Sequence, residues 1–296
     1  MECKYKRNIL DGKALLFDDN GICLLNATFV NGNIEGDVEI YDGGIPIFFG
    51  QFAQNEKNGY GYDKSHGEIV YEGYYKDGKR NGIGREYDEE GNVVADVVYV
   101  DGKKLNASVV VESGKYVMYL YNDKDQLESN GVIDESTGKY CDIVYRYHSD
   151  GTVSDICQFE NGRLFRILQR FKGSEMSEFD KSGNLIYKGG YGESDDGFCR
   201  EGIGTEYVLG KIVYHGDFEK GERNGNGREF EGGMCVYEGK FRNGLRDGKG
   251  RLFRKDGTLE FVGMWKEGEK VEEPVQEETE KPEVPLYPES IPSWMK

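Results

Sequence analysis

The sequence predicts an all-β protein: an extended array of tandem β-hairpins, followed by an extended, acidic, proline-rich C-terminal tail. Three observations predict it. A pattern of aromatic residues and glycines recurs about every 23 residues, glycine supplies 43 of the 296 residues, and 21 tyrosines with 15 phenylalanines supply much of the apolar bulk. Repeats this short cannot bury a hydrophobic face alone, so they stack on their neighbours.

Each repeat follows one frame. It reads aromatic-x-Gly-x-aromatic, then a glycine three residues later, then a polar stretch closing on Asn-Gly or Asp-Gly, then Gly-x-Gly and a further aromatic residue. Tyr214 and Tyr237 begin consecutive copies 23 residues apart. In the copy that starts at Tyr237 the frame consists of Tyr237, Gly239, Phe241, Gly244, Asp247-Gly248, Gly250 and Phe253.

The frame predicts a β-hairpin. Tyr237 and Phe241 are four residues apart, so on an extended strand they project from the same face. The polar segment that follows turns the chain, and its Asn-Gly or Asp-Gly pair suits positions that need a positive φ. Gly239 is predicted to be a position of close approach, because a side chain there would fill the space over which rings pack. We expect one face to carry a stack of Tyr214, Phe218, Phe230, Tyr237, Phe241 and Phe253.

Four segments follow from the spacing of these patterns. Residues 1–92 hold N-terminal repeats, weak at first and clear from Phe48 onward, and residues 187–268 hold the clearest copies. Residues 93–186 contain fewer glycines but alternate strands and turns on the same schedule, so we interpret them as degenerate repeats in a continuous sheet; a separate β-domain is the alternative. Residues 269–296 hold five of the six prolines and form the acidic tail.

The frame over residues 48–92 and 187–268 resembles the MORN repeat. That resemblance implies an elongated, single-layer antiparallel β-meander or solenoid, with an aromatic ladder on one face. It also implies a role as a scaffold or a dimerisation platform, so that a homodimer is one expected partner arrangement, and phospholipid binding is a role proposed for some members.

No motif of catalysis stands out. His66, His148 and His215 fall in different repeats, and the recurrent Gly-x-Gly pairs lack the remaining residues of a phosphate-binding loop. We therefore predict that the protein is not an enzyme and has no catalytic, cofactor-binding or metal-binding residues. The net charge of −17 makes nucleic acid a poor partner. Widely spaced cysteines, and the lack of a long apolar run, lead us to expect a cytoplasmic protein.

Two groups of residues are candidate binding sites. The segment 240–255 carries a local charge of +6 in an acidic chain, from Lys240, Arg242, Arg246, Lys249, Arg251, Arg254 and Lys255 against Asp247. Such a cluster either forms a solvated face paired with acids on neighbouring hairpins or contacts acidic lipid headgroups or an acidic protein surface. The tail ends in apolar residues that either dock a partner or cap the last hairpin: Leu286, Tyr287, Ile291 and Trp294.

These observations give two hypotheses of function. The first is a non-enzymatic scaffold that mediates protein–protein interactions in a cytoskeletal or ciliary (axonemal) assembly. The alternative is a peripheral membrane adaptor that binds acidic phospholipids through the basic segment 240–255.

Overall fold

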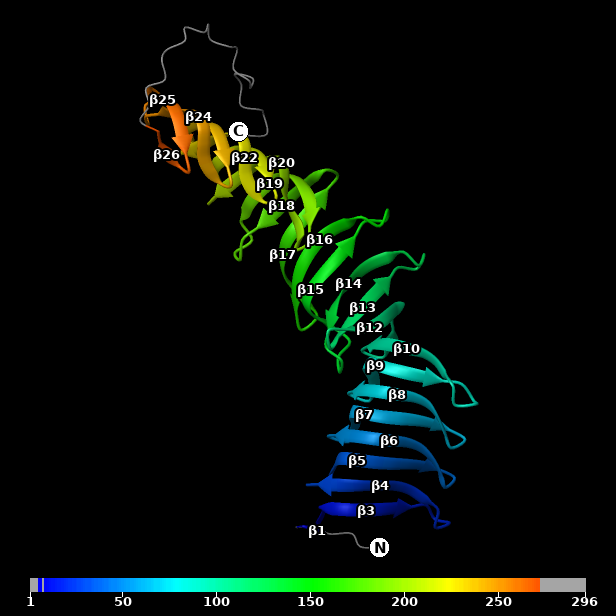
Figure 1. The fold of residues 1–296 in the computed structure, drawn as a ribbon. Helices are drawn as coiled ribbons and strands as arrows, with labels where there is room; N and C mark the ends of the chain where they lie inside the picture. The colour runs from blue at the N-terminus through cyan, green and yellow to red at the C-terminus, as the bar shows by residue number, and fades with distance from the viewer. Residues whose placement is uncertain (1–4, 7, 272–296) are drawn as a thin grey trace. The chain divides into compact units, whose positions relative to one another are not determined.

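A computed structural model describes residues 5–6 and 8–271, and every regular element in this part of the chain is a β-strand (Figure 1). Consecutive strands pair in antiparallel fashion as hairpins, which confirms the predicted fold class. The described residues fall into two compact units: those up to residue 173 together with 177–184, and residues 174–176 together with those from 185 onward. Each unit is described by itself. The predicted tail docking residues Leu286, Tyr287, Ile291 and Trp294 lie outside the described residues.

The first unit opens with a short pair of strands, followed by a nine-stranded sheet whose strand order is the order of the chain. The pair is β1 (Tyr5–Lys6) and β2 (Ile9–Leu10). The strands of the sheet are β3 (Gly12–Phe17), β4 (Cys23–Val30), β5 (Asn33–Asp42), β6 (Ile45–Ala53), β7 (Glu56–Ser65), β8 (Glu68–Lys76), β9 (Lys79–Tyr87), β10 (Val93–Val100) and β11 (Lys103–Lys104).

The sheet breaks between β11 and the next strand, so the interpretation of one continuous sheet is wrong at this point. The chain leaves the first sheet after Lys104 and begins a second one at Ala107. A small core of Val98, Met118 and Ile133 joins the two sheets. The strands that follow in this unit are β12 (Ala107–Glu112), β13 (Lys115–Tyr121), β14 (Leu127–Ile133), β15 (Tyr140–Tyr147), β16 (Val153–Glu160) and β17 (Arg163–Lys172).

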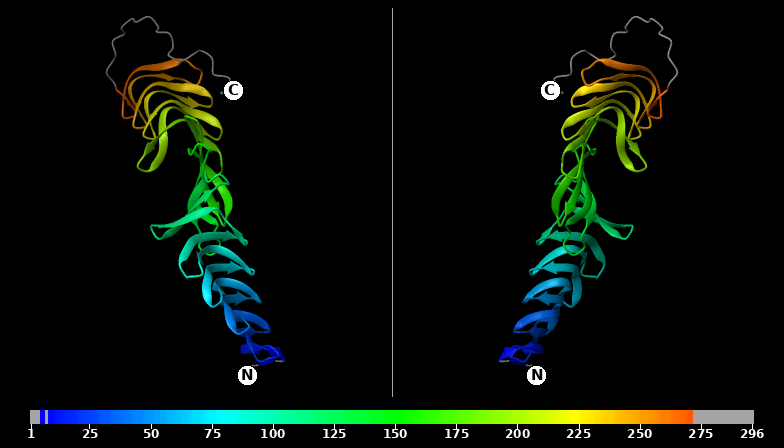
Figure 2. Two further views of the ribbon diagram at one scale, coloured as in Figure 1. Left: turned by 90° about the vertical axis from the view of Figure 1, so that its right-hand side faces the viewer. Right: turned by 90° about the vertical axis from the view of Figure 1, so that its left-hand side faces the viewer.

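The second unit is a meander of long strands in chain order (Figure 2). The division between the units falls within β18 (Glu175–Phe179). The strands that follow are β19 (Leu185–Ser194), β20 (Gly197–Val208), β21 (Lys211–Glu219), β22 (Glu222–Glu231), β23 (Met234–Arg242), β24 (Leu245–Phe253), β25 (Leu259–Lys266) and β26 (Glu269–Lys270).

The tight turns of the hairpins lie one step earlier in the frame than the sequence suggested. Strands β23 and β24 are joined by Asn243 and Gly244, with φ values of 49° and 79°. Two consecutive residues with positive φ are typical of the turns that match the right-handed twist of paired strands. The pair Asp247-Gly248, which we interpreted as turn chemistry, lies inside β24, where the pairing register with β23 shifts. Gly248 has a φ of 109° at this irregularity, so the glycine serves a bulge.

Candidate functional site

One face of each sheet, here called the ladder face, is built from rings laid over glycines. Tyr237 is fully buried, and a Cβ atom placed on Gly250 of the next strand would lie 2.3–2.6 Å from its ring and hydroxyl. A Cβ atom on Gly239 would lie 2.6 Å from both the Gly250 Cα and the Tyr237 hydroxyl. The prediction that Gly239 is a position of close approach is confirmed, because only glycine leaves room for the ring.

The rings of the ladder face come from every second strand. In the second unit, Tyr214 and Phe218 on β21 meet Phe241 on β23, with ring centroids 5.1 Å apart for Tyr214 and Phe241. Tyr187, Tyr237, Phe261 and Trp265 continue the row. Phe230 and Phe253, which we expected in the stack, are only half-buried. Both lie where the pairing register of their strand shifts at its C-terminal end, and among the described residues neither has a ring contact in this row.

A chain of alternating cations and carboxylates covers these rings. Arg223 Nη2 lies 2.5 Å from Glu206 Oε2, and Arg223 Nη1 lies 2.9 Å from Glu229 Oε1, so one guanidinium joins two carboxylates. The same guanidinium stacks 4.4 Å from the ring centroid of Tyr214. Guanidinium groups favour such contacts because their charge meets the negative face of the ring. In this unit the chain runs through Arg200, Glu206, Arg223, Glu229 and Arg246.

The nine-stranded sheet repeats this arrangement. Arg80 stacks 3.9 Å from the ring centroid of Tyr71 and pairs with Asp63 at 2.8 Å. Lys57 pairs with the same carboxylate at 2.9 Å, and Glu86 continues the chain to Lys104 at 2.5 Å. Sequence reasoning missed these charge chains. A signal for them is present, because a cation stands six residues before an acid in Lys57/Asp63, Arg80/Glu86, Arg200/Glu206 and Arg223/Glu229.

The basic segment 240–255 is divided between two faces. Arg246 belongs to the ladder face, where it pairs with Glu229 at 2.5 Å and stacks over Tyr237. It is therefore not part of a basic surface with the other candidates. Lys240, Lys249 and Arg251 are exposed on the other face of the sheet. Arg242 is 71% exposed beside a hairpin turn, whereas Arg254 and Lys255 lie beyond the opposite end of β24.

We call the side of each sheet away from the rings the opposite face. Over β23 to β25 of the second unit it carries polar and basic residues beside exposed apolar ones. Arg251 is paired in register with Glu238 on one side and with Val262 on the other, and Lys249 lies across from Met264. Val262 is 55% exposed and Met264 is 38% exposed. This face therefore combines cations with accessible apolar side chains.

In the nine-stranded sheet the opposite face is aromatic instead. Phe49 lies across from Tyr62, and Tyr60 lies across from Tyr74. The Tyr60 and Tyr74 ring centroids are 5.2 Å apart, and those of Tyr60 and Tyr62 are 5.6 Å apart. Phe49 is 41% exposed and Tyr60 is 36% exposed. Sequence reasoning missed this second row of rings, although it occupies the frame positions between the ladder residues.

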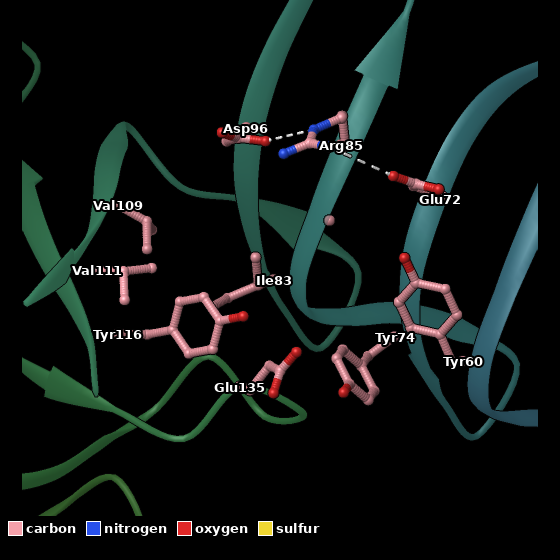
Figure 3. Close-up of a pocket in the computed structure, with 11 residues that line it drawn as sticks. Tyr60, Glu72, Tyr74, Ile83, Arg85, Asp96, Val109, Val111, Tyr116 and Glu135 are labelled. Carbon is pink, nitrogen blue, oxygen red and sulfur yellow. Dashed lines mark hydrogen bonds and ion pairs between the residues drawn. The ribbon is translucent and has the colours of Figure 1, made fainter. Parts of the chain in front are cut away.

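A groove of about 280 Å³ lies at the end of this row, where strands β12 and β13 stand beside the opposite face (Figure 3). One side of it is formed by Tyr116, Glu135, Tyr74 and Tyr60. The other side is formed by Asp96, Arg85 and Glu72. Burial raises the pKa of Tyr60 to about 12. Burial, and then the hydrogen bond to Glu135, raise the pKa of Tyr74. Both hydroxyls therefore stay protonated at neutral pH.

The loop between β14 and β15 holds one wall of the groove in place. The backbone N–H of Ile83 donates to the carbonyl oxygen of Glu135 at 2.8 Å, and Asn81 Nδ2 donates to the carbonyl oxygen of Ser136 at 3.0 Å. The Asn81 amide oxygen accepts from the backbone N–H of Asp101 at 3.0 Å, and this side chain is 1% exposed. A buried amide whose nitrogen and oxygen both form hydrogen bonds fixes local geometry. The backbone at Glu135 and Ser136 is thus held by two hydrogen bonds from β9.

The described residues contain neither a cluster suited to a metal ion nor a helix suited to crossing a membrane. No group of three or more histidine, cysteine, aspartate or glutamate side chains there could hold a metal ion. No helix suited to crossing a membrane occurs among the residues that the structure describes.

Comparison with known proteins identifies the repeat. The model of the MORN repeat matches four segments, residues 48–62, 71–93, 214–234 and 237–259, and these segments are MORN repeats. No curated protein matches the chain. Among solved structures, an alternansucrase in complex with isomaltononaose is 16% identical with a TM-score of 0.15, over 68% of this chain and 16% of its own. The TcdB2-TccC3-Cdc42 structure is 12% identical with a TM-score of 0.15, over 86% of this chain and 18% of its own. The chain thus spans less than a fifth of each of these structures.

Proposed function

We propose that the MORN repeats of this chain form a non-enzymatic scaffold that binds protein partners through its opposite face. One observation carries the proposal: equivalent frame positions hold different chemistry in the two units. Tyr74 and Lys240 are equivalent, as are Tyr62 and Arg228, whereas the ladder positions keep the same kind of residue. A face that only faced water would not need exposed rings in one unit and exposed cations in the other.

Affinity capture with face variants tests this function. In one variant Phe49, Tyr60, Tyr62 and Tyr74 are changed to serine; in a second, Lys240, Lys249 and Arg251 are changed to glutamine. We expect each variant to keep the far-ultraviolet circular dichroism of the intact chain, because the ladder is untouched, and at least one to lose captured proteins. Capture of the same proteins by the intact chain and by both folded variants would exclude the opposite face as the binding surface.

The membrane adaptor is the second candidate, and the observation that favours it is the mixture of Lys240, Lys249 and Arg251 with Val262 and Met264 on one face. Basic residues near anionic headgroups contribute about 1 kcal/mol each. Sedimentation with vesicles containing phosphatidylserine at about 150 mM salt tests it. Loss of binding in the glutamine variant, with binding kept in an Arg246→Gln variant that remains folded, would support the adaptor.

We further propose that the partners belong to a cytoskeletal or ciliary (axonemal) assembly in the cytoplasm. The resemblance to MORN-repeat scaffolds supports this part of the proposal. A fluorescently tagged full chain in ciliated cells tests it directly. Signal that stays diffuse and is removed by mild detergent extraction would speak against such an assembly, because cytoskeletal components remain in the insoluble fraction.

A further inference from the structure

The groove beside β12 and β13 brings three tyrosines and a carboxylate together without a cation to match them. Tyr60, Tyr74 and Tyr116 line it, and Glu135 lies between the last two (Figure 3). Among the described residues Glu135 has no ion-pair partner. Arg85, the one cation of the lining, is occupied by Asp96 at 2.8 Å and by Glu72 at 3.7 Å. The groove therefore offers negative charge and ring faces, and no group that would attract an anion.

We propose that this groove binds a lysine or arginine side chain presented by an extended, basic segment of a partner protein. Ring faces attract cations, and the attraction grows when the site is shielded from water. Glu135 supplies the opposite charge at the same place, and three carboxylates against one arginine give the lining a net charge of −2. A polar or acidic partner would leave the Glu135 carboxylate without an opposite charge, which is unfavourable.

The surroundings of the groove favour an extended segment. The row of Phe49, Tyr62, Tyr60 and Tyr74 leads into it across neighbouring strands, and these rings offer apolar contact to residues on either side of the bound cation. On the other side Val111 is 64% exposed next to Tyr116. Aromatic and aliphatic side chains of this kind supply contact area at low entropic cost. The net charge of −17 adds long-range attraction for a basic partner.

This inference rests on the proposed scaffold function and makes it specific. The test uses the full chain and a labelled nine-residue peptide with arginine at its third, fifth and seventh positions and serine elsewhere. Fluorescence anisotropy at about 150 mM salt measures binding, and a peptide with glutamine in place of arginine is the reference. We expect binding of the arginine peptide alone. A Tyr60→Leu, Tyr74→Leu double variant should bind about tenfold more weakly, because two ring faces are lost at similar volume.

Matched variants separate the groove from general attraction. Glu135→Gln should weaken binding about fivefold, whereas Glu89→Gln, which removes an exposed acid at the β9–β10 turn, should change it less than twofold. Tyr74→Phe keeps the ring face and should bind like the intact chain. Tyr145→Leu removes a tyrosine that is 37% exposed on β15, outside the groove lining, and should also be neutral.

Three results would overturn the proposal. The first is equal binding by the intact chain and the tyrosine double variant, which would mean that the peptide is held by net charge alone. The second is no binding of the arginine peptide by the folded intact chain. The third is self-association in sedimentation velocity that the tyrosine double variant abolishes, which would make a second copy the occupant. The scaffold function is tested independently, because partner capture through the second unit does not depend on this groove.

Discussion

The guanidinium of Arg246 lies 4.4 Å from the ring centroid of Tyr237, so a cation covers a tyrosine that has no exposed surface. Arg223 covers Tyr214 and Arg80 covers Tyr71 in the same way. Each of these rings rests on a glycine of the following strand on its other side. The buried layer of the protein is thus one ring thick, closed by glycine below and by a paired cation above.

The first prediction concerns the rings themselves. Phe241 is 3% exposed and touches Tyr214 and Tyr237, with centroid distances of 5.1 and 5.3 Å. Phe241→Ala should lower the free energy of unfolding by about 3–5 kcal/mol, because a buried ring is lost from a packed row. Phe253→Ala, at a half-buried position, should cost less than half as much. Urea unfolding measures both; a loss within about 0.5 kcal/mol for Phe241 would show that the ladder face is open.

The second prediction concerns the charge chain. Arg246 and Glu229 side chains are 24% and 20% exposed and lie 2.5 Å apart at their nearest atoms. A double-mutant cycle with Arg246→Ala and Glu229→Ala should give a coupling free energy of about 1 kcal/mol. Lys255 and Glu231, 76% and 62% exposed at 3.1 Å, form the control pair and should give less than about 0.5 kcal/mol. Equal coupling in both pairs would mean that partial burial does not strengthen the chain.

The third prediction concerns two tyrosines at equivalent positions. Tyr187 donates its hydroxyl to the carbonyl oxygen of Gly190 at 2.7 Å, whereas the buried hydroxyl of Tyr71 has no hydrogen-bond partner among the described residues. Tyr187→Phe should therefore cost about 1 kcal/mol of unfolding free energy, and Tyr71→Phe should be neutral or stabilising. Thermal unfolding of the two variants checks this. A Tyr71→Phe variant destabilised as strongly as Tyr187→Phe would reveal a bond to that hydroxyl.

The fourth prediction concerns pH. Burial alone would raise the pKa of Asp63, but hydrogen bonds from Lys57 and Arg80 hold that pKa below its ordinary value of 3.8. A pKa depressed in the folded state contributes stability above the unfolded pKa, and this stability is lost as the pH falls through the folded pKa. The melting temperature should therefore drop as the pH falls below about 4, and less steeply in Asp63→Asn. Glu56→Gln, at the exposed first residue of β7, is the control and should leave the slope unchanged.

Much of the ladder face follows from the sequence, because its residues recur at fixed places in every repeat. Tyr237, Gly239 and Phe241 lie in the structure as the period of two along a strand requires. The position of the turn was harder to predict, because Asn243-Gly244 and Asp247-Gly248 both suit a positive φ. Only the register of the paired strands distinguishes the turn from the bulge. The residue types of the repeat do not determine that register.

The opposite face and its groove could be predicted less well. Alternation alone places Arg246 on the side of Gly250 and Lys249 on the other, so the division of the basic segment was present in the sequence. Glu229, the partner of Arg246, lies 17 residues earlier, however, and that pairing depends on the register between the strands. The groove depends on the sheet break after Lys104 and on the docking of the Glu135 loop, neither of which leaves a periodic signal.

The charge chain has a consequence for how such an array grows. Glu206 and Glu229 are each shared by two arginines, so every internal link is balanced and one repeat adds one cation and one acid. Duplication of a repeat inside the row therefore adds no net charge, and every added arginine and glutamate finds a partner. At the position equivalent to Glu229, the following repeat carries Leu252, which is where the row stops. The row of rings continues through Phe261 and Trp265 on β25, so the length of the charge chain, and not the number of repeats, is set by the position at which a carboxylate is replaced.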